Sequence, residues 1–121
     1  MRNADVVSVE CGETGATSNV WIDLYHLIDA RRLGELRALA ASRTPEPHAL
    51  GIIGLYKAGA YSRPQAEALL RALDQRVMTC GGCIISPANP EDLVEMLDAP
   101  SPADLEAHGH DWRRPTESID L

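Results

Sequence analysis

The sequence predicts an α+β fold in one small domain, and three observations lead to this prediction. Two stretches near the start alternate apolar and polar residues, as strands do, two short stretches of strand composition flank a later Gly-Gly pair, and other stretches repeat apolar residues at helical spacing. The chain has 121 residues, of which 45% are apolar and 24% charged, a composition typical of a single globular domain. Two tryptophans, three tyrosines and no phenylalanine are present, so aliphatic side chains must fill most of the core.

The N-terminal part is predicted to form a β-hairpin. Residues 5–11 alternate apolar and polar side chains, which is the period of a half-buried strand. Residues 13–18 have the composition of a turn, and alternation resumes over residues 20–25. We therefore expect a second strand there that folds back on the first.

The central part is predicted to be helical. Apolar residues recur at helical spacing over residues 28–42, and the following linker, residues 43–47, contains two prolines. A second helix should then end at Gly59. Ser62 and Gln65 have the spacing of a capping box, with Pro64 in the first turn, so a third helix is expected after them. Residues 48–76 thus predict a helical hairpin.

A short second hairpin and two capped helices are predicted for the rest of the domain. Residues 77–79 and 84–86 have strand composition and flank a Gly-Gly turn. Asn89 is placed to cap a helix through about Leu97, and Ser101 to cap a shorter one. We assign residues 1–110 to a single domain and residues 111–121 to a polar tail that docks on a surface.

The negative charge of the chain is concentrated in its last third. Residues 1–88 contain nine acidic and nine basic residues, whereas residues 89–121 contain nine acidic and two basic ones, which accounts for the whole net charge of −7. Such asymmetry is typical either of a solvated surface or of a surface that faces a basic partner. The candidate partner-binding residues are the acidic side chains of this part and the apolar anchors of the tail: Glu91, Asp92, Glu95, Asp98, Asp104, Glu106, Trp112, Ile119 and Leu121.

Two of the three cysteines form the sharpest local motif of the sequence. Cys80 and Cys83 have the spacing of a zinc knuckle, and His108 and His110 are the nearest candidates for the other two ligands. The alternatives are two reduced thiols beside a Gly-Gly turn, or a redox pair. An activated redox cysteine needs a helix after it, and here a strand is expected. Zinc is therefore a secondary hypothesis, and we expect no other cofactor.

The helical hairpin also fits a helix-turn-helix, with Gly59 in the turn. An acidic protein repels phosphate, so direct nucleic-acid binding is not expected. The only lysine is Lys57, which leaves residues 12–18 without the lysine of a phosphate-binding loop. Because no nucleophile can be matched with a base, the chain is not expected to be an enzyme.

Composition also bears on location and function. The apolar stretches are too short to span a bilayer, and an odd, small number of cysteines fits a reducing compartment, so we expect a cytoplasmic protein. The leading hypothesis is a non-enzymatic protein-binding module, an inhibitor or an assembly component, that presents its acidic C-terminal surface to a basic partner such as a nucleic-acid-binding protein. The alternative is a small zinc-stabilised or helix-turn-helix regulatory domain. The sequence leaves the oligomeric state open.

Overall fold

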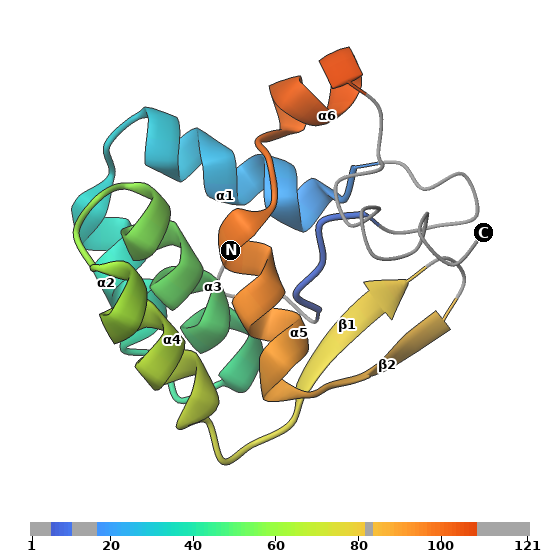
Figure 1. Cartoon of the computed structure of the whole chain (residues 1–121). Helices are drawn as coiled ribbons and strands as arrows, with labels where there is room; N and C mark the ends of the chain where they lie inside the picture. Colours follow the sequence, from blue (N-terminus) through green and yellow to red (C-terminus); the bar gives the residue numbers. More distant parts are fainter. Residues whose placement is uncertain (1–5, 11–16, 82–83, 109–121) are drawn as a thin grey trace.

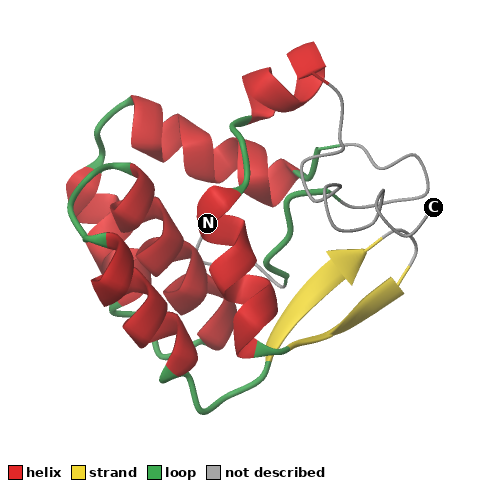
Figure 2. Ribbon diagram, in the orientation of Figure 1, coloured by secondary structure: helices red, strands yellow, loops and turns green. Residues whose placement is uncertain are grey.

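The computed structural model describes residues 6–10, 17–81 and 84–108, and it confirms the α+β class (Figure 1). Helices gather on one side of the molecule and a two-stranded antiparallel sheet extends from the other (Figure 2). In chain order the elements are α1 (Asn19–Asp29), α2 (Leu33–Ala40), α3 (Pro45–Lys57), α4 (Arg63–Arg71), β1 (Val77–Gly81), β2 (Ile84–Ala88), α5 (Pro90–Glu95), the 3₁₀-helix η1 (Met96–Asp98) and α6 (Pro102–His108).

Helix α3 is the centre of the fold. Every residue from 49 to 55 is buried, so the helix is enclosed by its neighbours and has no solvent face in this stretch. It contacts α1, α2, α4, β1 and η1. A Cβ atom built on Gly51 would lie 2.2 Å from the backbone nitrogen of Ala40, closer than atoms can approach. Glycine at this position therefore allows the backbones of α2 and α3 to pack directly against each other.

The predicted second strand over residues 20–25 is wrong, because these residues lie in helix α1. The hydroxyl of Ser18 accepts the backbone N–H of Trp21 at 3.1 Å, which is an N-cap, and it donates to the carbonyl of Ser8 at 2.6 Å. Trp21, Leu24 and Ile28 are buried on one face of the helix. Residues 20–25 alternate apolar and polar side chains and so fit a strand over six positions. The cap at Ser18 and the helical spacing of the buried residues Trp21, Leu24 and Ile28 favour a helix.

The first predicted strand is present only as a short extended segment. Glu10 of this segment forms an isolated antiparallel bridge with Thr17. The N–H of Val7 donates to the carbonyl of Met78 in β1 at 2.7 Å. The N-terminal segment thus lies against β1 and does not pair with residues 20–25. Cys11, at the end of the predicted strand, lies outside the described residues.

The single helix predicted over residues 28–42 is two helices that meet at Arg31. This residue has a φ of 57°, the left-handed conformation that glycine adopts most easily. The N–H groups of Arg31 and Arg32 donate to the carbonyls of Ile28 and Leu27, which closes α1 in a Schellman motif. The chain then turns and begins α2. Sequence periodicity continued across the break because both helices bury leucines on one face.

The helical hairpin and the second β-hairpin are confirmed. Helix α3 begins at Pro45, inside the predicted linker, and is followed by Gly59 with a φ of 86°. Ser62 caps α4 by accepting the N–H of Gln65 at 3.3 Å. Each strand extends two residues beyond the prediction at its C-terminal end, and the register pairs Val77 with Ala88 and Gly81 with Ile84. The helix predicted through about Leu97 ends as an α-helix at Glu95 and continues as the 3₁₀-helix η1.

Candidate interaction surface

The chain after β2 folds back onto the helices. We call residues 90–108 the C-terminal segment, and it contains α5, η1 and α6. Trp21 of α1, itself fully buried, donates its indole N–H to the carbonyl of Pro100 at 2.9 Å. Lys57 at the end of α3 donates its Nζ to the carbonyls of Leu97 at 3.2 Å and Ala99 at 2.7 Å. These three hydrogen bonds attach η1 and the residues between η1 and α6 to the helical core.

Lys57 lies in an environment of carbonyls and aromatic rings. Its Nζ is 5.5 Å from the ring centroid of Trp21 and 5.7 Å from that of Tyr25, distances that allow cation–π attraction. Burial lowers the pKa of Lys57 to about 8, with Asp98 opposing this shift and Arg63 adding to it. Burial, together with the charges of Asp29 and Asp104, raises the pKa of Tyr25 to about 12. The ammonium group of Lys57 therefore binds carbonyls of its own chain and is not presented to a partner.

Two arginines of α4 tie the acidic residues of the C-terminal segment to the helices. Arg63 contacts both oxygens of Asp98, at 2.5 and 3.1 Å, and also Glu67 at 2.7 Å. Arg71 contacts Glu67 at 2.9 Å and both oxygens of Glu91, at 3.0 and 3.1 Å. We call this alternating series, which runs from Asp98 through α4 to Glu91, the ion-pair chain. Its hydrogen bonds lower the pKa of each of the three carboxyls.

The structure divides the six predicted acidic residues into two groups. Glu91 and Asp98 belong to the ion-pair chain, and Asp92 forms a reciprocal capping box with Asn89 at the start of α5. A large part of the acidic excess thus has a structural use within the molecule. The other three residues are Glu95 of α5 and Asp104 and Glu106 of α6, and they are exposed, as are Glu91 and Asp98.

Within the described ranges, the carboxylates of Asp104 and Glu106 have no ion-pair partner. Both belong to α6, which contacts α1. We call these two side chains the α6 carboxylates. The apolar anchors predicted beside them, Trp112, Ile119 and Leu121, lie outside the described residues, as does the rest of the predicted tail.

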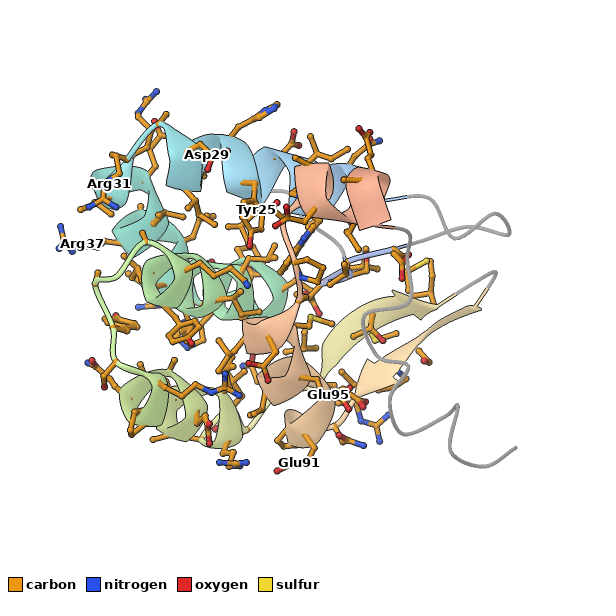
Figure 3. All side chains as sticks on the ribbon, turned by 45° about the horizontal axis from the view of Figure 1, so that its top comes forward. Tyr25, Asp29, Arg31, Arg37, Glu91 and Glu95 are labelled. Atoms are coloured by element: carbon orange, nitrogen blue, oxygen red, sulfur yellow. The ribbon has the colours of Figure 1, made fainter. Side chains whose placement is uncertain are left out.

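The structure also contains a basic surface that the sequence reasoning missed. Four exposed arginines lie within α2 or beside it, and we call them the arginine end: Arg31, Arg32, Arg37 and Arg43. Figure 3 shows Arg31 and Arg37 at one extremity of the molecule, well separated from Glu91 and Glu95 on the C-terminal segment. The signal was available as four arginines within 13 positions, but counting charge over the whole of residues 1–88 concealed it.

The arginines of this end are engaged to different degrees. Arg31 donates to the carbonyl of Ala58 at 3.0 Å, which links the turn before α2 to the end of α3. Arg32 forms an ion pair with Glu35 one helical turn away. In the part of the chain that the structure describes, Arg37 and Arg43 form no ion pair, so their guanidinium groups face solvent.

Of the four predicted zinc ligands, Cys80 is the one whose side chain the structure describes. Cys80 lies in β1 and is disulfide-bonded, so its sulfur offers no thiolate to a metal unless the bond is first reduced. Cys83, His110 and the side chain of His108 lie outside the described residues. Among the residues that are described, no three histidine, cysteine or carboxylate side chains are grouped to hold a metal ion.

The helix-turn-helix hypothesis is disfavoured by the contacts of α4. A recognition helix presents its cationic side chains to phosphates or base edges. Here Arg63 and Arg71 are held by three carboxylates, so a phosphate would have to displace them. The exposed side chains of this helix include Gln65, Ala68 and Leu69, which carry no charge.

A shallow hollow of about 200 Å³ lies where the end of α4 meets the start of β1 and the start of α5. Leucines and a valine form its floor, and Asp74, Gln75 and Arg76 supply its polar lining. It contains no histidine, cysteine or pair of carboxylates that would suit acid–base or nucleophilic chemistry.

The described helices are all too short or too polar to cross a bilayer. Comparisons of the chain with known protein families, with curated proteins and with solved structures found no match.

Proposed function

We propose that this protein is a binding module that recognises a basic surface on another macromolecule, acting as an inhibitor or as a component of an assembly. The observation that carries the proposal is the exposure of the α6 carboxylates, which form no ion pair within the described ranges. Carboxylates in this state are available to a partner without loss of an internal ion pair.

The way the C-terminal segment is held supports the same proposal. Trp21 and Lys57 fasten the backbone just before α6, at Leu97, Ala99 and Pro100. Because both donors are at least partly buried, the start of α6 is fixed relative to the core before any partner arrives. A surface fixed in this way loses little conformational entropy on binding.

The arrangement narrows the set of residues that a partner would contact. Glu91 and Asp98 are neutralised by arginines of the same chain, and Asp92 completes a cap. We therefore assign recognition to Asp104 and Glu106 of α6. A basic nucleic-acid-binding protein is a partner of suitable chemistry, because carboxylates can occupy the positions of phosphates.

Affinity capture from host lysate tests the proposal with three forms of the full chain. They are the wild type, the variant Asp104→Asn/Glu106→Gln, and the control Glu35→Gln/Asp74→Asn, which removes the same charge from exposed positions elsewhere. We expect one stoichiometric partner to be retained at low salt by the wild type and the control, and to be lost from the α6 variant. Equal capture by all three forms would show that the α6 carboxylates do not bind it.

A further inference from the structure

The arginine end is a second charged surface that the proposed function does not use. Residues 31–43 contain four arginines and one acidic residue, Glu35. Arg31 adopts a left-handed backbone conformation that glycine would adopt with less strain, yet its side chain is what reaches the carbonyl of Ala58. The turn is thereby held firmly, and Arg37 and Arg43 project from α2 and the residues just after it with no ion-pair partner among the described residues.

The two surfaces of unsatisfied charge lie on different elements of the fold. The arginine end surrounds α2, and the α6 carboxylates belong to the last described helix (Figure 1). Helix α2 packs mainly on α3, whereas α6 packs on α1. Because of this separation the positive and negative side chains do not neutralise each other within one molecule, although they are complementary in sign.

We propose that a second copy of this chain docks its arginine end onto the α6 carboxylates of the first. The inference rests on the proposed function, because it takes the α6 carboxylates to recognise a basic surface and identifies that basic surface as the arginine end of another copy of the chain. Opposite charges at such a contact steer two molecules into one orientation and fix their register. Each guanidinium carries several N–H donors in a planar fork, which suits a carboxylate acceptor.

The symmetry of the contact follows from the placement of the two surfaces. The patch that one copy contributes differs from the patch that its neighbour contributes, so a single contact between two copies is heterologous, whereas a two-fold dimer would form the contact twice. In the heterologous arrangement each copy of a pair keeps one unused arginine end or one unused pair of α6 carboxylates, and further copies can add to form a ring or an open filament. The overall charge of −7 on every copy opposes this growth, so the association is weak and most evident at high protein concentration.

Sedimentation velocity of the full chain tests the proposal over a range of protein concentrations, in roughly 20 mM and roughly 500 mM salt. We expect the average mass of the wild type to rise with concentration at low salt and to return to that of the monomer at high salt. The variant Arg37→Gln/Arg43→Gln should associate at least tenfold more weakly. Its control, Gln65→Glu/Gln75→Glu, has the same net charge but keeps the arginine end, and it should associate more strongly than the arginine variant.

A mixing experiment identifies the two surfaces as partners. Arg37→Glu/Arg43→Glu and Asp104→Arg/Glu106→Arg should each be monomeric when alone, because each presents like charges to its own copies. A mixture of the two should associate, since each retains the surface that the other lacks. Failure of the mixture to associate, or a wild type that stays monomeric at low salt, would overturn the proposal.

The outcome is separable from that of the proposed function. A monomeric wild type that still captures a basic partner through its α6 carboxylates would refute the self-association alone. A wild type that associates with itself, while lysate capture does not depend on the α6 carboxylates, would refute the foreign partner alone.

Discussion

Replacing Gly51 by alanine tests the close packing at the centre of the fold. The new Cβ would lie 2.2 Å from the backbone nitrogen of Ala40, 2.6 Å from its Cα and 2.7 Å from the carbonyl carbon of Leu39. Carbon atoms in contact normally stand about 3.5 Å or more apart. Helices α2 and α3 would therefore have to separate by roughly 1 Å, and since the obstructing atoms belong to the backbone, no side chain can turn aside to avoid this.

The magnitude follows from two opposing effects. Overpacking of a core costs about 1–3 kcal/mol, and a clash with backbone belongs at the upper end of that range or beyond it. Alanine is favoured over glycine in a helix by about 1 kcal/mol, which offsets part of the loss. We expect Gly51→Ala to lower the free energy of unfolding by about 2 kcal/mol or more, measured by urea denaturation followed by circular dichroism.

Gly34 provides the matched control within the same pair of helices. Nothing lies within 4 Å of a Cβ atom built on this residue of α2, so only the preference for alanine acts. Gly34→Ala should raise the free energy of unfolding by up to about 1 kcal/mol. If Gly51→Ala were as stable as the wild type, the close approach of α2 and α3 described above would be incorrect.

Three further predictions concern buried or bonded groups. Because burial lowers the pKa of Lys57 to about 8, the unfolded chain binds more protons than the folded chain between pH 8 and about 10. The free energy of unfolding should therefore increase with pH in this window, by about 1 kcal/mol for this half-buried group. Tyr25, with its pKa raised to about 12, lowers the free energy of unfolding as pH rises, but only above pH 10. Urea unfolding at pH 7.5 and 9.5 should show the increase in the wild type and not in Lys57→Met. Since Cys80 is in a disulfide and the chain has three cysteines, alkylation of the unreduced, denatured protein followed by mass spectrometry should label one cysteine, and three labels would contradict the disulfide. Glu46→Ala should cost about 1–3 kcal/mol, because its buried carboxylate accepts the backbone N–H of Met78 at 2.9 Å, whereas Glu46→Gln keeps an acceptor and should lose less.

The parts of the fold that sequence reasoning predicted are those with strong local signals. The helical hairpin was marked by Gly59 and by the cap at Ser62, and the second β-hairpin by a Gly-Gly turn. Helix α1 was missed because six residues that alternate apolar and polar side chains fit a strand as well as they fit a helix. The distinguishing contact is the cap at Ser18, whose hydroxyl accepts the N–H of Trp21 three positions later and also donates to the carbonyl of Ser8 ten positions earlier.

The candidate site was predicted less well than the fold. Sequence located the acidic residues but could not show that Glu91 and Asp98 pair with arginines 20 and 35 positions away, since such pairs depend on how α4 lies against the C-terminal segment. The same long-range packing explains why Lys57, the only lysine, was not recognised as a link between α3 and the segment. Charge counted along a chain therefore overestimates the charge that a partner can reach.

The attachment of the C-terminal segment bears on how this protein can change over evolution. Trp21 and Lys57 donate to main-chain carbonyls at Leu97, Ala99 and Pro100, and every amino acid supplies such a carbonyl. Exchange of a side chain in this stretch therefore leaves the acceptors in place, while the buried side chains of Leu97 and Ala99 must still fit the core. Natural variants could in this way acquire different binding specificities on α6 while its placement on the core is inherited unchanged.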